Sequence, residues 1–397
     1  MLDRRGFIGA ASGMAATLSL PRIAYAARAP TDRRFVFLIQ RGAADGLHIL
    51  APTGDPAFAA QRSAFADKLE GGRALGSSFF TLHPALARIG QMAEQKQARF
   101  VHATASAYRD RSHFDGQNVL ESGGLRPYAE KTGWMNRLLT QLPGARGRGL
   151  AIAPAIPMAL RGPAQVATYA PSALQDASDD LMTRVSALYA DDPQLAPLWQ
   201  SALATQKLAG DIAGDNGRNA AAIGALAARL LGPREGARVM MIESNGWDTH
   251  SGQAPRMAGQ LKGVDAFVAA LADGLGLAWQ ETLLIVATEF GRTVAINGTG
   301  GTDHGTGGLM MLMGGALPGG GQVDAEWPGL TPAALLDGRD LRPTIASEAV
   351  IGGALAAHFD IDPAQLMAPC IPRSRASKRG WPDALDRMGG AGHEGRR

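Results

Sequence analysis

The sequence predicts an α/β fold in which helices cover both faces of a mostly parallel central sheet, giving a three-layer sandwich. Short, continuous apolar runs predict strands that are buried on both faces, as in a parallel sheet. Such runs occupy residues 34–39, 99–103, 238–242, 282–288 and 309–313. Between them lie stretches with apolar residues at three- and four-residue steps, most clearly residues 257–279, and this spacing predicts helices. Because strand and helix signals alternate along the chain, a layered α/β architecture follows.

The sequence marks some of these elements more clearly than others. Residues 34–39 lead into a polar, glycine-rich turn at 40–46, and residues 282–288 (TLLIVAT) form the clearest apolar run. Residues 144–219 are harder to assign, because a candidate strand at 150–156 is followed by alanine-rich helical sequence. We interpret residues 144–219 as an insertion or cap on the same domain.

The composition favours one large globular domain. With 397 residues, of which 46% are hydrophobic and 19% charged, the chain can bury a sizeable core. No linker-like segment divides it, so we expect a single domain over residues 27–372 and a poorly ordered tail over 373–397. Acidic and basic residues are nearly balanced after residue 26, which argues against a nucleic-acid binder. The single Cys370 excludes an internal disulfide and a cysteine-based zinc cluster.

The first 26 residues have the three parts of a signal peptide. A charged start with Arg4 and Arg5 is followed by an uncharged, alanine-rich middle and by small residues around Ala26. The arginine pair before Phe7 is typical of twin-arginine signals, which predicts export of the folded protein to the periplasm or the medium. The alternative is an ordinary secretory signal or a retained anchor. The apolar middle is too short and too weakly hydrophobic for a stable membrane span.

Polar side chains gather where the predicted strands end, and ligands bind at such ends in open α/β sheets. Carboxylate oxygens and neutral imidazole nitrogens suit divalent zinc, manganese or magnesium. A hydrolase built on such ions also needs a nucleophile, and a hydroxyl at a helix start is favoured there. The residues at these ends are Arg41 and Asp45, Ser112 and His113, Asp248 and His250, Glu289 and Arg292, and Asp303 and His304.

Each of these residues also has a plain structural explanation. Asp45 before Gly46 is typical of a turn, and Ser112 is typical of a helix cap. Glu289 and Arg292 are suitably spaced for a salt bridge beneath a loop. The coincidence of such residues at successive strand ends is therefore the stronger indication of function.

Five short motifs hold these residues. They are residues 41–42 with 45–47, 111–114 (RSHF), 246–250 (GWDTH), 288–293 (TEFGRT) and 301–305 (GTDHG). Together they resemble domain-of-unknown-function family 1501, which is grouped with the alkaline-phosphatase and sulfatase superfamily and carries twin-arginine signals. The resemblance extends from about residue 34 to about residue 359.

The resemblance implies an alkaline-phosphatase-like fold and places candidate roles on individual residues. Asp45 would bind one metal ion, Asp248 and His250 a second, and His304 with Asp303 would complete the set. Ser112, beside His113, would be the nucleophile, although Thr104 and Ser106 lie in the preceding loop. Superfamily enzymes carry an Asp-His pair where this chain has Glu289 and Phe290, so one ion site loses an imidazole. The alternatives are an empty site, an altered site, or a centre that holds a single ion. We therefore expect one or two divalent ions, held by Asp45, Asp248, His250, Glu289 and His304, with zinc or manganese as candidates.

Two functions are consistent with these candidate roles. The first is an exported metal-dependent hydrolase of phosphate or sulfate esters, in which Arg41 or Arg292 holds a small anionic ester. The second is a catalytically degenerate relative that keeps the fold and binds or assembles with a co-exported partner. The resemblance points to a partner of the 1800 type, another exported family of unknown function.

Overall fold

The computed structural model describes residues 32–142, 148–170, 179–193, 195–209, 219–363 and 366. The predicted signal peptide, the predicted tail at 373–397 and Cys370 lie outside these described residues. Of the described residues, 179–204 belong to a small helical unit and the others to an α/β body. Each unit is compact by itself, and the single domain expected over 27–372 stays a prediction.

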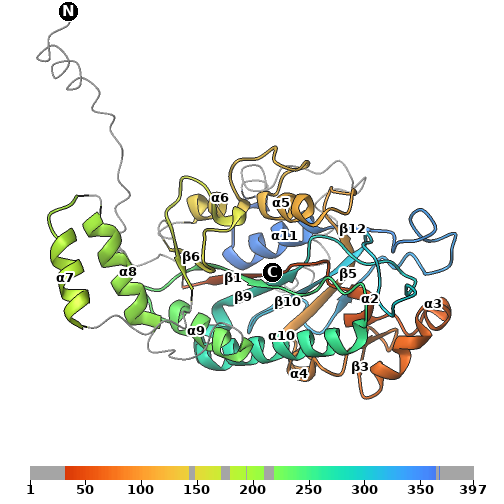
Figure 1. The fold of residues 1–397 in the computed structure, drawn as a ribbon. Coiled ribbons are helices and arrows are strands. Elements are labelled where there is room, and N and C mark those ends of the chain that lie inside the picture. The colour runs from red at the N-terminus through yellow and green to blue at the C-terminus, as the bar shows by residue number, and fades with distance from the viewer. Residues whose placement is uncertain are drawn as a thin grey trace, which may run out of the picture. The chain divides into compact units, whose positions relative to one another are not determined.

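The α/β body is built on one large sheet, which in the described part of the chain has nine strands. These are β1 (Arg34–Gln40), β5 (Ala98–Ala105), β6 (Gly149–Ile152), β7 (Val166–Tyr169), β8 (Val239–Ser244), β9 (Thr282–Ala287), β10 (Gly308–Met313), β11 (Val323–Asp324) and β12 (Ile345–Ala346). Their order across the sheet is β11-β5-β10-β9-β1-β8-β6-β7, and β12 also pairs with β5 (Figure 1). A separate antiparallel sheet has the order β2-β4-β3, from β2 (Leu50–Ala51), β3 (Arg73–Leu75) and β4 (Phe80–Leu82).

Helices lie on both faces of the large sheet, which confirms the predicted three-layer α/β arrangement (Figure 1). The helices α4, α9 and α10 contribute to the core on one face, and α5, α6 and α11 to the core on the other. The bounds of the α-helices are α2 (Gly46–Ile49), α3 (Pro56–Ala66), α4 (Ala87–Glu94), α5 (His113–Ser122), α6 (Trp134–Gln141), α7 (Asp179–Tyr189), α8 (Leu195–Ala209), α9 (Ala220–Leu231), α10 (Gln253–Leu275) and α11 (Ser347–Phe359). Short 3-10 turns are η2 (Asp67–Leu69), η3 (Met158–Leu160) and η4 (Gly276–Glu281).

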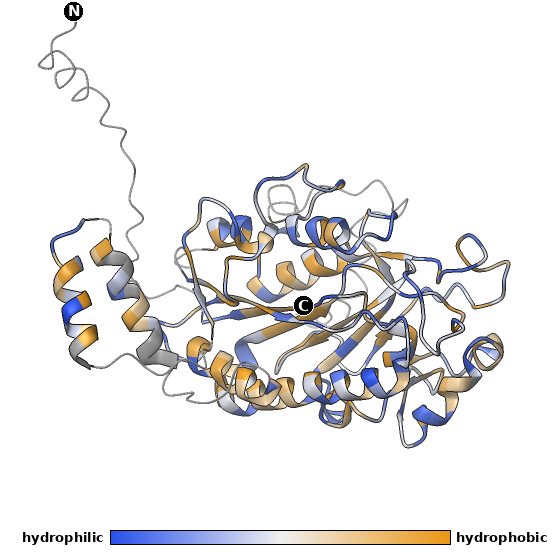
Figure 2. Cartoon of the chain, in the orientation of Figure 1, coloured by the Kyte–Doolittle hydropathy of each residue, from blue (hydrophilic) through white to orange (hydrophobic). Residues whose placement is uncertain are grey.

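Strand β1 shows why a continuous apolar run becomes a central strand. It pairs in parallel with β8 on one side and with β9 on the other, and all seven of its residues are buried. Val36 and Leu38 pack into the core beneath α4, α9 and α10, whereas Phe35 and Phe37 pack into the core beneath α6 and α11. Because both faces are covered, no polar alternation is needed, and Figure 2 shows the apolar strands inside the helical layers.

Strand β10 departs from the parallel arrangement, because it is antiparallel to both of its neighbours, β5 and β9. The segment 288–307 returns directly from β9 to β10 without a crossover helix, and such a return gives an antiparallel pair. As a result, the start of β10 lies at the same edge of the sheet as the carboxyl ends of β1, β5, β8 and β9. This edge carries the candidate site.

The segment predicted as an insertion contributes to both units. Strands β6 and β7 pair in parallel and extend the large sheet beyond β8. Helix α7 and most of α8 form the helical unit, in which the indole nitrogen of Trp199 donates to the hydroxyl of Ser186 at 2.8 Å.

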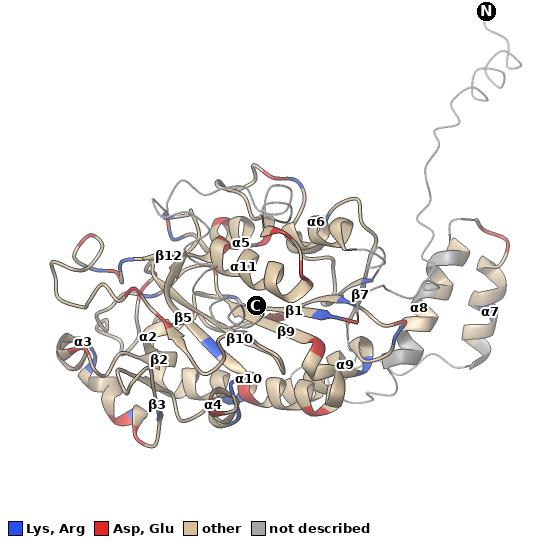
Figure 3. Ribbon diagram, turned by 180° about the vertical axis from the view of Figure 1, so that it is seen from behind, with Lys and Arg blue, Asp and Glu red and all other residues tan. Residues whose placement is uncertain are grey.

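The helix predicted at 257–279 is present as α10, followed by the 3-10 turn η4. The α-helix ends at Leu275 because Gly276 has a φ of +53°, a conformation that glycine adopts readily. Among the described helices, none is long and apolar enough to cross a membrane. Acidic and basic residues are interspersed along the ribbon in Figure 3, as the balanced charge predicts.

Candidate metal centre

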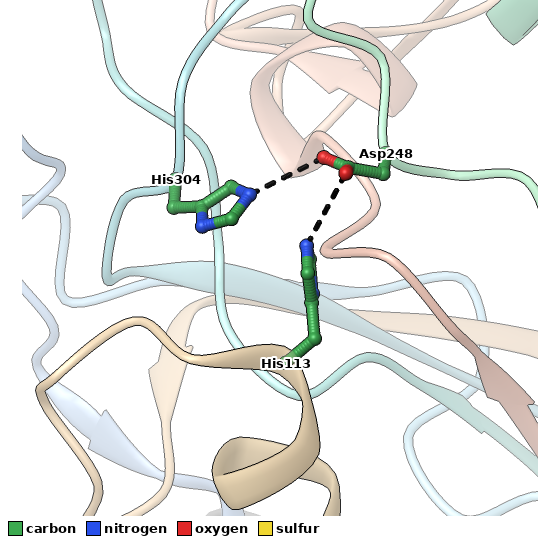
Figure 4. Close-up of side chains that lie close together, drawn as sticks. All are labelled: His113, Asp248 and His304. Atoms are coloured by element: carbon green, nitrogen blue, oxygen red, sulfur yellow. Dashed lines mark hydrogen bonds and ion pairs between the residues drawn. The ribbon is translucent and has the colours of Figure 1, made fainter.

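Three side chains from distant parts of the sequence converge at this edge of the sheet. His113 begins α5, Asp248 follows β8, and His304 precedes β10, and one ligand atom of each lies within 4.8 Å of the other two (Figure 4). The Nε2 atom of His113 lies 3.5 Å from Asp248 Oδ2, and Nε2 of His304 lies 3.3 Å from Asp248 Oδ1. The Asp248 side chain is 44% exposed, so a ligand can reach the cluster from solvent.

A fourth group, His250, stands beside this cluster. Its Nε2 atom lies 2.9 Å from Asp248 Oδ1 and 2.9 Å from Nε2 of His304. Three of the residues that the sequence marks as metal ligands are therefore adjacent, together with His113.

The opposite nitrogen of each imidazole faces an oxygen atom that can only accept a hydrogen bond. Each Nδ1 atom must therefore carry the proton, which leaves a lone pair on Nε2 of the neutral ring. The three pairs are His113 with Glu289 Oε1 at 2.8 Å, His250 with Asp303 Oδ1 at 3.0 Å, and His304 with the backbone oxygen of Arg111 at 2.9 Å.

This arrangement suits a divalent cation. Lone pairs on neighbouring nitrogens and a carboxylate repel one another unless a proton or a cation lies between them. The Nε2 atom of His113 is buried and has no hydrogen-bond partner among the described residues. Imidazoles whose far nitrogen donates to a carboxylate or carbonyl are typical of metal sites, and nitrogen with carboxylate ligands suits zinc or manganese.

Glu289, another metal ligand that the sequence predicts, lies behind His113 and accepts several hydrogen bonds there. Its Oε1 atom accepts from Nδ1 of His113, from the backbone nitrogen of Gly42 at 2.8 Å and from Gln117 at 3.0 Å. Burial alone would raise the pKa of the Glu289 carboxyl, but the hydrogen bonds from His113 and Gln117 lower it overall. The bond to Glu289 in turn raises the pKa of His113. Glu289 therefore lies behind the imidazole and orients it.

Arg292 contacts the cluster through Asp248. Its Nη1 atom lies 2.6 Å from Asp248 Oδ1, and its other nitrogens donate to the hydroxyl and the backbone oxygen of Thr302. Burial raises the pKa of the Asp248 carboxyl, whereas the hydrogen bond and charge of Arg292 lower it to a value below the usual one. The guanidinium predicted to hold an anion is thus bound to a candidate metal ligand.

Asp45 lies in a buried ion pair. Its Oδ1 atom caps α2 by accepting from the backbone nitrogen of Leu47 at 3.1 Å. Its Oδ2 atom accepts from Arg62 at 2.5 Å and from Gln253 at 2.6 Å, and the Arg62 side chain is fully buried. Asp45 is not part of the three-residue cluster found in the described chain.

Arg41, the other predicted anion-binding group, is held by carboxylates. Its Nη2 atom lies 2.8 Å from Glu121 and 2.7 Å from Glu243, and its Nη1 atom donates to Gln117. Both terminal nitrogens of Arg41 therefore have protein partners, and its role in anion binding stays a prediction.

The three candidate nucleophiles lie in different surroundings. Thr104 is buried within β5, and the hydroxyl of Ser106 accepts from the backbone nitrogen of Tyr108 at 3.3 Å. Ser112 occupies the N-cap position of α5, but its side chain makes no capping hydrogen bond. Its hydroxyl is therefore uncommitted to the helix, directly before His113.

Two features of the site were not predicted from the sequence. Gln253 connects three segments, because its Oε1 accepts from Thr249 and Thr302 while its Nε2 donates to Asp45. Nothing distinguishes this glutamine in the sequence except its position three residues after His250. The second feature is the φ of +61° at Arg111, an uncommon backbone conformation for a residue with a side chain. The backbone oxygen of Arg111 itself is the partner of His304 Nδ1.

Comparison with known proteins gives distant structural likenesses. The crystal structure of Ps i-CgsB in complex with k-i-k-neocarrahexaose is 11% identical, with a TM-score of 0.44, over 84% of this chain and 73% of that one. The C-terminal periplasmic domain of EcEptC from Escherichia coli is similar in two crystal structures, both 10% identical. Its complex with Zn gives a TM-score of 0.33 over 75% of this chain and 78% of that one, and the other structure gives 0.36 over 89% and 92%. At such low identities and TM-scores, these likenesses say nothing about the chemistry of this chain.

At the level of sequence, no curated protein matches this chain. A family model does match, and it covers residues 32–349, which include every motif that carried the resemblance. The chain therefore belongs to the family described as "Protein of unknown function (DUF1501)".

Proposed function

We propose that this protein is an exported, metal-dependent hydrolase of phosphate or sulfate esters, related to the alkaline phosphatases and sulfatases. The observation that carries the proposal is the convergence of three imidazole Nε2 atoms on the carboxylate of Asp248, with each far nitrogen fixed by an oxygen atom. Such a set of donors, open to solvent, fits one divalent ion of the zinc or manganese type.

The ligands of this ion would be His113, Asp248 and His304, with His250 as a fourth. When bound, the ion would neutralise charge on the anionic ester and make its central atom easier to attack. Glu289, Asp303 and the Arg111 carbonyl would keep the three imidazoles in the binding tautomer.

Ser112 is the proposed nucleophile, because its hydroxyl stands at the N-terminus of α5, where the helix dipole favours developing negative charge. Its oxygen would bond to the phosphorus or sulfur as the bond to the alcohol oxygen breaks, and its proton would pass to the departing alcohol. Water would then release the phosphate or sulfate from Ser112. Arg292 would keep Asp248 ionised throughout.

The proposed location is the periplasm or the medium. Its support is the arginine pair, the apolar stretch and the small residues before Ala27 in the sequence.

A second candidate function is binding or assembly without turnover, with a co-exported partner protein. The ion pair between Arg292 and Asp248 favours it, because a guanidinium 2.6 Å from a ligand oxygen competes with a cation for that oxygen. In the described residues one cluster of three ligands is found, rather than the two ion sites of the superfamily enzymes.

Metal analysis distinguishes the two. Purified protein is stripped with chelator and titrated with zinc and manganese, alongside Asp248→Ala and His304→Ala. The surface variant Asp273→Ala, which removes a side chain that is 68% exposed, is the control. Stoichiometric binding that both site variants lose, and the control keeps, supports the metal centre, whereas a folded wild-type protein that binds neither ion contradicts it.

Turnover is then assayed with aryl phosphates and aryl sulfates on the metal-loaded protein. The hydrolase predicts activity that Ser112→Ala abolishes. Metal binding without any turnover across this panel favours the binding or assembly function.

A further inference from the structure

Gln253 lies next to the candidate metal centre without being one of its ligands. It is the first residue of α10, three residues after the candidate ligand His250, and it is completely buried. A buried amide costs free energy unless its oxygen and its nitrogen are both hydrogen-bonded. The partners of this amide therefore show what holds it and what it can hold in turn.

The orientation of the Gln253 amide follows from the carboxylate of Asp45. Its Nε2 atom lies 2.6 Å from Asp45 Oδ2, and this carboxylate is paired with the buried guanidinium of Arg62. An ionised carboxylate oxygen can only accept a hydrogen bond, so the amide must present its nitrogen there. The same nitrogen lies 3.5 Å from Nδ1 of His48. The opposite atom of the amide is then the oxygen Oε1, which can only accept.

Two buried threonine hydroxyls donate to this oxygen. Oγ1 of Thr249 lies 3.0 Å from Gln253 Oε1, and Oγ1 of Thr302 lies 2.7 Å from it. Both threonines are completely buried. Thr249 belongs to the loop 248–250 and Thr302 to the loop 302–304, and these loops carry three of the four candidate ligands. The loops also meet directly, since the backbone nitrogen of Thr302 donates to the backbone oxygen of Thr249 at 3.2 Å.

The bond from Thr302 to Gln253 also decides how Arg292 is held. A threonine hydroxyl has one proton, and because this proton goes to Gln253, the hydroxyl oxygen accepts from Nε of Arg292 at 3.2 Å. Nη2 of Arg292 donates to the backbone oxygen of Thr302, and Nη1 lies 2.6 Å from Oδ1 of Asp248. A continuous chain of hydrogen bonds therefore connects Gln253 with the carboxylate of Asp248.

We propose that Gln253 is a positioning residue of the metal centre. It orients the Thr302 hydroxyl and so keeps Arg292 on Oδ1 of Asp248. The other carboxylate oxygen, Oδ2, lies 3.5 Å from Nε2 of His113, so the guanidinium and this imidazole contact different oxygens. The inference rests on the proposed function, because the groups that Gln253 positions are those that would bind the ion.

Metal affinity tests this role without any turnover. Affinity for zinc, or for manganese if the wild type binds only that ion, is measured on the full chain by competition with a chelator. Gln253→Met keeps a long, unbranched side chain and removes the amide. Thr302→Val removes the hydroxyl but keeps the branched shape, whereas Thr302→Ser keeps the hydroxyl. Circular dichroism checks that each variant is folded.

Asn136→Ala is the matched control. Asn136 is also a completely buried amide that is bonded at both ends, but it lies in α6. Its Nδ2 donates to the backbone oxygens of Leu160 and Ala164, and its Oδ1 accepts from the backbone nitrogen of Ala164. A loss of metal affinity that reflects only a less stable fold would appear in this variant too.

We expect Gln253→Met and Thr302→Val each to weaken metal binding by roughly three- to thirtyfold, as the loss of one member of a hydrogen-bond network does. Thr302→Ser should bind the ion within about twofold of the wild type, because it keeps the hydroxyl. Asn136→Ala should lower the free energy of unfolding and leave metal affinity unchanged.

The role is wrong if Gln253→Met binds the ion like the wild type, or if Asn136→Ala loses as much affinity as Gln253→Met. It is also wrong if Thr302→Ser loses as much affinity as Thr302→Val. Should Gln253→Met not fold, the comparison of the two Thr302 variants decides by itself.

The same measurements separate this inference from the hydrolase. Weaker metal binding in the variants, without turnover of any ester, would support the role of Gln253 and contradict the hydrolase. Turnover of esters by a protein whose Gln253→Met variant binds the ion normally would do the reverse. A wild-type protein that binds neither zinc nor manganese would overturn both.

Discussion

Replacing Glu289 by glutamine tests whether this carboxylate supports metal binding from behind His113. The substitution keeps the shape of the side chain and an oxygen that can accept the bond from Nδ1 of His113, 2.8 Å away. It removes the negative charge that is buried behind the imidazole. The expected consequence is a weaker ligand, because the carboxylate raises the basicity of the ring and fixes its tautomer.

The magnitude follows from comparable partners of metal-bound imidazoles, whose loss weakens metal affinity by about 10- to 100-fold, or about 1.4 to 2.8 kcal/mol. Zinc affinity is measured by competition with a chelator of known affinity, on protein whose fold is checked by circular dichroism. Glu243→Gln is the matched control. Glu243 lies at the same edge of the sheet and pairs with Arg41, and it makes no hydrogen bond to an imidazole among the described residues.

A Glu289→Gln protein that is folded and binds zinc as tightly as the wild type would refute this role. An equal loss in Glu243→Gln would also refute it, since the effect would then come from any carboxylate at this edge.

Three further predictions concern stability, each measured by chemical unfolding. Arg62→Ala should lower the free energy of unfolding by about 3 to 5 kcal/mol, because it leaves the fully buried carboxylate of Asp45 without its ion-pair partner; a loss below 1 kcal/mol would contradict this. Trp134→Ala should lower the free energy of unfolding by about 3 to 5 kcal/mol, because the ring is completely buried and its removal leaves a large cavity. A near-normal stability would contradict this prediction and show that the core collapses into the cavity. Burial lowers the pKa of His102 to about 4, whereas the unfolded chain takes up this proton near pH 6.5. Stability should therefore fall as the pH drops from about 6.5 to about 4, by about 3 kcal/mol from this residue, and His102→Gln should show a shallower pH dependence than the wild type.

The sequence predicted the sheet well because buried strands carry a local signal. Every apolar run that we assigned became a strand, since a segment covered on both faces has no polar residues to obscure it. The direction of β10 could not be predicted in this way. Hydrophobicity does not encode strand direction, and the missing crossover helix in 288–307 is a weaker signal than an apolar run.

The candidate site was predictable where it depends on strand ends, and not where it depends on side-chain partners. Asp248, His250 and His304 lie close together because their strands meet at one edge. Asp45 also follows a strand, but Arg62 from the neighbouring helix takes its carboxylate. No pattern in the sequence indicates which side chains will bond to a given carboxylate. The contact of Glu289 with His113 could not be predicted for the same reason.

The reversal of direction at β10 gives the segment 288–307 an unusual modular character. Both of its ends are anchored at one rim of the sheet, so a single uninterrupted stretch delivers a guanidinium, an imidazole and the carboxylates that steady two other rings. Exchanging that stretch between relatives would transplant these groups as one cassette, with the framework beneath left unchanged.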